Sequence, residues 1–119
     1  MSYRIAIGTV DGIMVTEHFG RGKGFLIVEI NQQTDEVKNI GMIEVVHSES
    51  CSSGHDDNMI RQKIQAFLDW KVVAILVRQI GPNSERMVTK NGIEVLVSEG
   101  KIEEVLKKVI RFYKRRNFE

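Results

Sequence analysis

Cysteine, long apolar runs and an excess of charge of either sign are all scarce or missing in this chain of 119 residues. Cys51 is the one cysteine, so no internal disulfide can form, and such cysteine usage suits a reducing compartment. The formal net charge is +1, which gives no global signal for nucleic acid or a membrane surface. No apolar run approaches the roughly 18 residues of a membrane helix, and residues 1–5 lack the pattern of a signal peptide. We therefore expect a single cytoplasmic domain over residues 1–119, with no membrane or nucleic-acid partner.

The first half of the chain has the pattern of three strands. Apolar runs cover residues 3–8 and 25–30, and residues 37–46 alternate loosely between apolar and polar side chains. The polar segment 31–36 predicts a hairpin turn between the second and third strands. Residues 47–55 are small and polar, so we expect a loop there.

The second half alternates between helix and strand. Asp56 or Asp57 is expected to cap a helix, because a short carboxylate accepts hydrogen bonds from the free N–H groups of a first turn. Residues 72–77 and 93–97 are apolar runs, the first of them typical of a strand that is covered on both faces. Two helical faces are apolar: Ile60, Ile64, Phe67 and Leu68 form the first, and Ile102, Val105, Leu106, Val109, Ile110 and Tyr113 form the second.

A short helix is predicted between the last two strands, beginning at Gly81-Pro82 and ending at Asn91-Gly92. The element order is then βββαβαβα. Right-handed crossovers make the later strands parallel to the first, and the hairpin supplies one antiparallel strand. We expect a ribonuclease H-like three-layer α/β fold: a five-stranded mixed sheet of order 3-2-1-4-5, with strand 2 antiparallel and helices on its faces.

In this layout several loops converge on one edge of the sheet, which we call the rim. Ligands of open α/β sheets bind at the carboxyl ends of strands, near the switch in strand order. The loops expected there are 9–24, 47–55, 79–82 and 98–100. They make neighbours of residues distant in sequence, namely His18, Cys51, His55 and Gly81.

His18 is the first candidate ligand. It lies in a glycine-rich turn directly before a strand, and a neutral imidazole is a common metal ligand. A carboxylate such as Glu17 or Asp11 could orient its second nitrogen. The alternative is a turn histidine that packs on Phe19 or caps the backbone.

His47, Cys51 and His55 form the second candidate, spaced four residues apart in the predicted loop. Imidazole together with thiolate suits zinc or an iron–sulfur species. The alternative, which spacing alone favours, is a solvated loop with an incidental thiol.

Two further features allow a binding role beside a plainer one. The free N–H groups after Gly81 attract anions, although a simple strand-to-helix turn accounts for the same residues. The basic helical tail, about residues 107–119, carries cations that complement a helix dipole. A docking site for an acidic partner or an anionic cluster is the alternative there.

Hydrolytic chemistry is disfavoured by the first strand. A metal-dependent nuclease of this layout needs a carboxylate in the middle of that strand, and Arg4-Ile5-Ala6-Ile7-Gly8 has none. The sequence also shows no recognisable Ser/His/Asp or Cys/His catalytic set. A metal-dependent hydrolase is therefore the weakest of the functional alternatives.

The chain resembles the dinitrogenase iron–molybdenum cofactor biosynthesis domain family, the domain shared by the NifX and NafY carriers and the C-terminal part of NifB. The most specific element is Glu17-His18-Phe19-Gly20-Arg21 before the strand Phe25-Leu26-Ile27-Val28. The match begins with the opening strand Arg4-Ile5-Ala6-Ile7. After the histidine motif, less specific elements occur in the right order: Ile80-Gly81-Pro82-Asn83, Asn91-Gly92-Ile93-Glu94-Val95 and Glu103-Glu104-Val105-Leu106.

The resemblance implies a ribonuclease H-like fold and a carrier that is not an enzyme. Its cargo would be an iron–sulfur or iron–molybdenum-type cluster, and the isolated protein can be without it. The partners would be cluster donor and acceptor proteins, and the protein itself a monomer or weak homo-oligomer. By the resemblance, His18 is the candidate cofactor ligand. Our leading hypothesis makes it a metal ligand and adds Cys51 as a second, in the form of its thiolate. The full set of cofactor-binding residues is His18, Phe19, Gly20, Arg21, Cys51, His55 and Gly81.

A protein-interaction or regulatory module of the same fold, without cargo, is the alternative function. Its surface would be an edge of the sheet or the basic last helix. Failure of the protein to take up a cluster would favour it.

Overall fold

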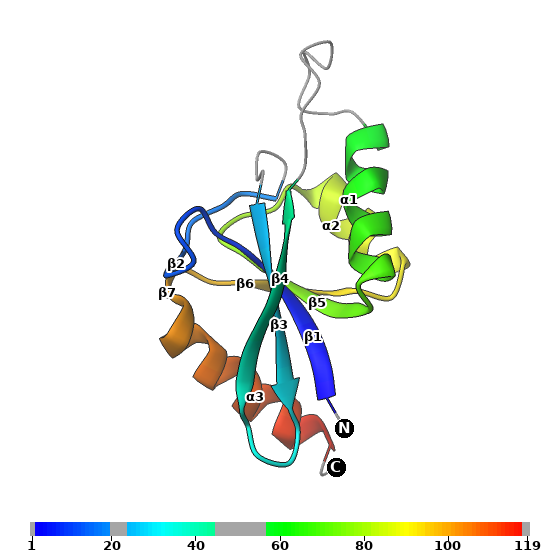
Figure 1. Ribbon diagram of the computed structural model, residues 1–119. Coiled ribbons are helices and arrows are strands. Elements are labelled where there is room, and N and C mark those ends of the chain that lie inside the picture. Colours follow the sequence, from blue (N-terminus) through cyan, green and yellow to red (C-terminus); the bar gives the residue numbers. More distant parts are fainter. Residues whose placement is uncertain (1, 20–23, 45–56, 118–119) are drawn as a thin grey trace.

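A mixed five-stranded sheet forms the centre of the computed structural model, which describes residues 2–19, 24–44 and 57–117, with side chains described from 60 to 115 in the last range. The strands lie in the order β4-β3-β1-β5-β6 (Figure 1). β3 is antiparallel to both neighbours, whereas β1, β5 and β6 are parallel. The expected mixed α/β sheet is confirmed, with bounds β1 (Ser2–Gly8), β3 (Gly24–Asn31), β4 (Val37–Glu44), β5 (Val72–Val77) and β6 (Glu94–Val97).

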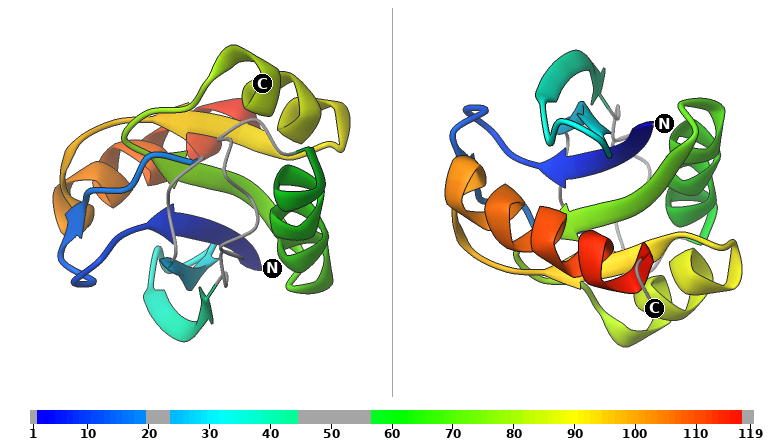
Figure 2. Two further views of the ribbon diagram at one scale, coloured as in Figure 1. Left: turned by 90° about the horizontal axis from the view of Figure 1, so that it is seen from above. Right: turned by 90° about the horizontal axis from the view of Figure 1, so that it is seen from below.

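Helices cover the sheet on two sides. α1 (Asp57–Asp69) and α2 (Pro82–Lys90) pack on one face, and α3 (Ile102–Asn117) packs on the other (Figure 2). Because side chains alternate across a strand, β1 supplies Ala6 to the first core and Ile5 and Ile7 to the second. The result is a three-layer arrangement with a separate apolar cluster on each side of the sheet.

The helix predictions hold at most positions. In α1, Ile60, Ile64 and Phe67 are buried, but Leu68 stays 40% exposed. Asp57 is the first residue of α1, and Asp56 lies outside the described residues. The apolar face of α3 is buried as expected, with Ile102, Val105, Leu106 and Val109 in the core and Ile110 and Tyr113 packed against it.

The predicted bounds of α2 are confirmed. Gly81 is its N-cap residue and Pro82 its first residue, where the missing N–H costs no helical hydrogen bond. At the other end the N–H of Asn91 donates to the carbonyl oxygen of Val88, and Gly92 follows with φ +83°. A positive φ suits glycine at the end of a helix.

β5 departs from the expected strand that is covered on both faces. The pairing with β1 shifts register, so that Val72 and Ala74 are partners of Arg4 and Ile5. Val73 is the extra residue of this bulge, and it is 41% exposed. A bulge turns its extra residue out of the regular alternation, which accounts for that exposure.

A second, two-stranded sheet was not predicted. β2 (Met14–Val15) pairs antiparallel with β7 (Gly100–Lys101), and the N–H of Ile102 donates to the carbonyl oxygen of Ile13 at 2.8 Å. Two-residue strands are too short to show a periodicity in sequence. This pairing ties the loop after β1 to the start of α3. None of the helices within the described residues is long and apolar enough to cross a membrane.

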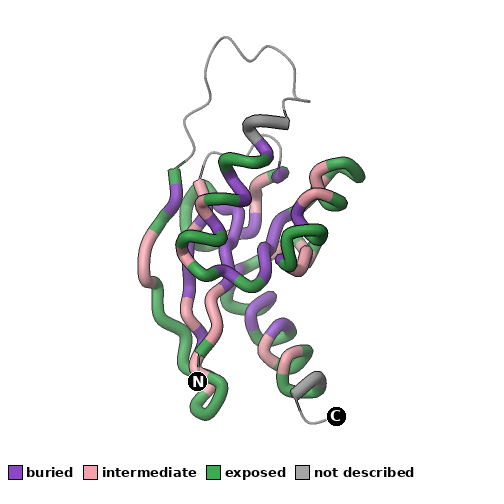
Figure 3. Tube along the Cα trace, turned by 90° about the vertical axis from the view of Figure 1, so that its right-hand side faces the viewer, coloured by how far each residue is buried: buried purple, intermediate pink, exposed green. Residues whose placement is uncertain are grey.

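The edge strand β4 is largely exposed along its length (Figure 3). The predicted strand ran to residue 46, and the part beyond Glu44 lies outside the described residues. Ile43 is buried, and Ile40 and Gly41 are partly buried. At Gly41 the indole of Trp70 packs directly over the backbone. A Cβ at Gly41 would collide with that ring.

Gly41→Ala should therefore destabilise the protein by about 1–3 kcal/mol, the usual cost of forcing a packed side chain aside. Urea unfolding monitored by tryptophan fluorescence measures this change. Asn39→Ala, at an exposed position of the same strand, is the matched control. Equal stability of the two variants would show that Trp70 moves away at no cost.

Candidate functional site

The segment that carries His18 runs across the ends of β1 and β5. The N–H groups of Thr16 and Glu17 donate to the carbonyl oxygen of Gly8 at 3.1 and 3.2 Å. The segment then pairs with the chain leaving β5, because Arg78 donates its N–H to the carbonyl oxygen of Glu17 at 3.0 Å. Gly8 permits the crossing, since a Cβ there would lie 3.0 Å from the Cβ of Glu17.

His18 lies beside Gln79, as the rim hypothesis requires. The two residues form an isolated parallel bridge, and the N–H of Phe19 donates to the carbonyl oxygen of Gln79 at 2.8 Å. The third loop joins them, because Ser98 donates its N–H to the carbonyl oxygen of Val77 at 3.0 Å. The structure therefore brings three of the four predicted loops to one edge. The fourth, 47–55, is outside the described residues.

His18 and Phe19 are oriented oppositely. His18 is exposed, whereas Phe19 is 0% exposed and belongs to the core cluster under α1. The Phe19 ring lies 6.3 Å from that of Phe25 and 6.4 Å from that of Phe67, measured between centroids. Phe19 was expected to contact a ligand, but its ring faces away from solvent. We interpret it as the apolar anchor of the His18 segment.

Gly81 is part of the same edge, two residues after Gln79. Nothing lies within 4 Å of a Cβ built on it, so the space beside the start of α2 is open. No side chain caps this helix end. The free N–H groups of a helix N-terminus favour an anion nearby. The other predicted site residues, Gly20, Arg21, Cys51 and His55, lie outside the described residues, and so does His47.

Lys63 is the buried residue that sequence reasoning missed. It lies on α1 and is 1% exposed, and its Nζ donates to the carbonyl oxygen of Phe19 at 2.6 Å. The ammonium is 5.1 Å from the Phe19 ring centroid and 6.0 Å from that of Phe25, within the range of cation–π attraction. A signal existed in the sequence, because Lys63 occupies the i+3 position of the apolar stripe that begins at Ile60.

Burial dominates the protonation equilibrium of Lys63. Removing the ammonium from water disfavours its charged form, and this lowers the pKa of Lys63 from 10.5 to about 8. The carboxylate of Glu17 opposes the shift by attracting the ammonium. Glu17 immediately precedes His18, so one buried cation and one carboxylate flank the candidate ligand.

Asp11 has a different task from the one considered for it. Its Oδ1 accepts hydrogen bonds from the N–H groups of Ile13 and Met14 at 2.8 and 3.0 Å, and from the Thr9 hydroxyl at 3.3 Å. These bonds lower the pKa of the Asp11 carboxyl. Asp11 therefore organises its own turn, and no contact with His18 supports a role in orienting the imidazole.

The described residues do not form a closed metal site. Within residues 2–19, 24–44 and 57–117, no three His, Cys, Asp or Glu side chains lie together in a way that could hold a metal ion. Structural zinc sites need four protein ligands.

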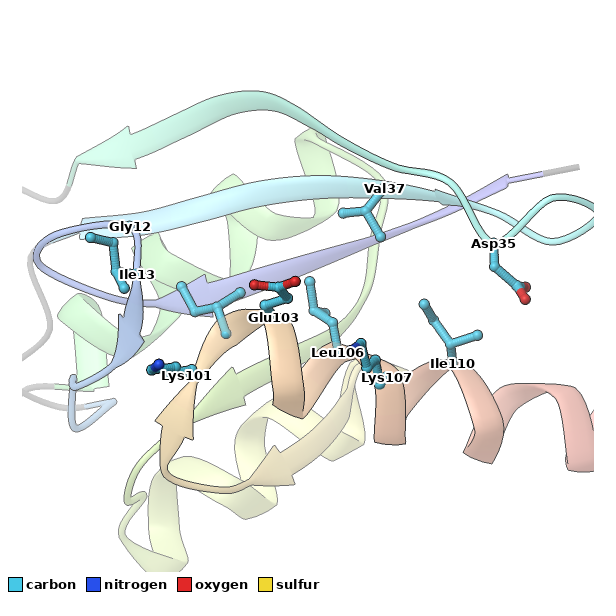
Figure 4. A pocket seen from close by; sticks show the side chains of 10 residues that line it. Gly12, Ile13, Asp35, Val37, Lys101, Glu103, Leu106, Lys107 and Ile110 are labelled. Atoms are coloured by element: carbon cyan, nitrogen blue, oxygen red, sulfur yellow. The ribbon is translucent and has the colours of Figure 1, made fainter.

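A groove of about 470 Å³ lies on the α3 side of the sheet (Figure 4). Apolar side chains from the β1–β2 loop, β4 and α3 line it, and charged groups flank them. They include Ile13, Val37, Leu106 and Ile110 with Lys101 and Lys107. This surface is formed by other residues than the His18 edge.

Comparison with known proteins gives a consistent result. The family model described as dinitrogenase iron–molybdenum cofactor matches residues 1–111. Among solved structures, PH0822 is 26% identical with a TM-score of 0.68, over 90% of this chain and 89% of that one. A search of curated proteins found no match.

Two more distant structures share the fold. MJ0327 from Methanocaldococcus jannaschii is 22% identical with a TM-score of 0.62, over 93% of this chain and 90% of that one. The apo form of the orange protein from Desulfovibrio gigas is 24% identical with a TM-score of 0.59, over 93% of this chain and 87% of that one.

The buried Lys63 predicts an unusual pH dependence of stability. Between pH 8 and 10.5 the unfolded chain binds more protons at this lysine than the folded chain, so stability must rise with pH. Relative to Lys63→Met, wild-type protein should gain about 3 kcal/mol across this window, because each unit of pKa shift corresponds to about 1.4 kcal/mol.

Urea unfolding of both proteins at pH 7.5, 9 and 10.5 measures this difference. Arg61→Met, which removes an exposed cation from the same helix, should show no such trend. A constant difference between wild type and Lys63→Met would mean that Lys63 titrates normally in the folded protein.

Proposed function

The chain belongs to the dinitrogenase iron–molybdenum cofactor family, and on that premise we propose that it is a non-catalytic carrier. Its cargo is an iron–sulfur or iron–molybdenum-type cluster, bound at the His18 edge and passed from a donor protein to an acceptor. The carrier acts in the cytoplasm as a monomer or weak homo-oligomer.

The exposed, rigidly held His18 carries the proposal. On one side of His18 the carbonyl oxygen of Glu17 accepts from the N–H of Arg78, and on the other side the N–H of Phe19 donates to Gln79. The His18 side chain itself is exposed to solvent. Imidazole nitrogen is a good ligand for iron. One exposed protein ligand also permits release, which a carrier requires.

Other groups complete the proposed site. The open N-terminus of α2 at Gly81 offsets negative charge on the cargo, and Arg21 adds a cation. Cys51 supplies a second ligand as thiolate, with His55 in the same predicted loop. The strand order and the helices on both faces support the ribonuclease H-like assignment of the scaffold.

An interaction module without cargo is the second candidate. The groove beside α3 favours it, because exposed apolar side chains such as Ile13, 62% exposed, are typical of binding surfaces. In this case the His18 turn would be structural only, and a partner protein would co-purify with the chain.

Cluster uptake separates the two functions. Apo protein is incubated anaerobically with a synthetic [4Fe–4S] cluster or with isolated iron–molybdenum cofactor, and uptake is followed by iron content, absorbance and electron paramagnetic resonance. Wild type should bind stoichiometrically. His18→Ala should bind at least about tenfold more weakly. Removing a residue that only hydrogen-bonds to a metal ligand already lowers metal affinity about tenfold or more, so removing the ligand itself should cost at least as much.

Gln33→Ala is the control, because Gln33 is an exposed polar residue in the turn between β3 and β4. It should bind like wild type. Absence of uptake by wild-type protein would refute the carrier. Equal uptake by His18→Ala would keep the carrier but move the ligand elsewhere.

A further inference from the structure

We propose that Lys63 is a positioning residue for this site: its buried ammonium holds the carbonyl oxygen of Phe19 and thereby fixes the turn that presents His18. The part of this inference that concerns cargo rests on the proposed function. The part that concerns the turn rests on the geometry of the described residues.

Phe19 is held at three points. Its N–H donates to the carbonyl oxygen of Gln79, its carbonyl oxygen accepts from Lys63, and its ring packs in the core with Phe25 and Phe67. A hydrogen bond from a charged donor is shorter and stronger than a neutral one, and 2.6 Å fits that description. The residue after His18 is therefore held both by the chain that leaves β5 and by α1.

Packing alone does not account for a lysine at this position. The neighbouring stripe residues Ile60, Ile64 and Phe67 are apolar, and a methionine of similar length would fill the same space. Removing an ammonium from water is costly unless it is paired. The hydrogen bond to Phe19 and the attraction of Glu17 are specific compensations, and both partners flank His18.

The position of the charge also suits an anionic cargo. The ammonium lies beneath the segment 17–19, and such a fixed cation in a low-dielectric interior raises the potential at the surface above it. The carboxylate of Glu17 attracts this ammonium. Arg78, whose N–H donates to the carbonyl oxygen of Glu17, forms an exposed ion pair with Glu99 at 3.4 Å. Lys63 therefore adds a positive contribution to the electrostatic potential above the segment 17–19, and solvent does not screen this contribution because the ammonium is buried.

Amide hydrogen exchange tests the positioning role without any cargo. The amide of Phe19 donates to Gln79, and the amide of Arg78 donates to Glu17. In Lys63→Met both amides should exchange at least about tenfold faster, because local opening of the His18 segment becomes easier. Amides that pair β1 with β3 should keep their wild-type rates. Arg61→Met should change neither group of amides.

Cluster binding is measured on the same proteins with the synthetic [4Fe–4S] cluster. Lys63→Met should bind about tenfold more weakly, and Arg61→Met as tightly as wild type. Failure of wild-type protein to bind would refute the proposed function alone, because the exchange rates still decide whether Lys63 positions the turn.

Unchanged exchange at Phe19 and Arg78 in folded Lys63→Met would overturn the proposal, whatever the cluster result. Lys63→Leu is the second variant, in case methionine fits poorly, and the same exchange rates are expected. Global unfolding of both variants would also overturn it, because Lys63 would then support the whole core and not this turn.

Discussion

The burial of Phe19 is the constraint on which the candidate site depends. Its ring is 0% exposed between the sheet and α1, so the extended segment that crosses the ends of β1 and β5 can lie in one way only. Successive side chains of an extended segment point to opposite sides, and His18 must then face solvent. Backbone hydrogen bonds to Gln79 and from Arg78 fix the register of the crossing. The exposed histidine is a direct consequence of the buried phenylalanine.

A charge in the core accompanies this arrangement. Lys63 loses hydration, which is unfavourable, and gains a hydrogen bond to Phe19 and the field of Glu17. Among the residues that the structure describes, Lys63 is the one charged side chain that is buried. The ammonium lies on the side of the sheet that carries the His18 segment, because its hydrogen-bond acceptor is the carbonyl oxygen of the next residue, Phe19.

Much of the fold was predictable because the signals are local. The apolar runs, the helical stripes and the Gly81-Pro82 and Asn91-Gly92 boundaries each act within a few residues. The position of His18 beside Gln79, in the loop after β5, also followed from the rule that parallel strands end at one edge. Four features did not follow: the bulge at Val73, the pairing of β2 with β7, the anchoring role of Phe19 and the burial of Lys63. Each depends on contacts between segments distant in the chain, which leave no period in the sequence.

The sequence by itself determined the periodicity of each element, the α/β class and the family, because these depend on local propensity and on a specific motif around His18. Only the tertiary structure decided which neighbours of His18 are buried and what lies beneath them. Lys63 is 44 residues from Phe19 in the chain. From the sequence alone, a lysine on the apolar face of a helix is equally consistent with an exposed side chain at the edge of that face and with a buried cation. The choice is made by packing, since only the folded core excludes water from the ammonium and brings a carbonyl oxygen within reach.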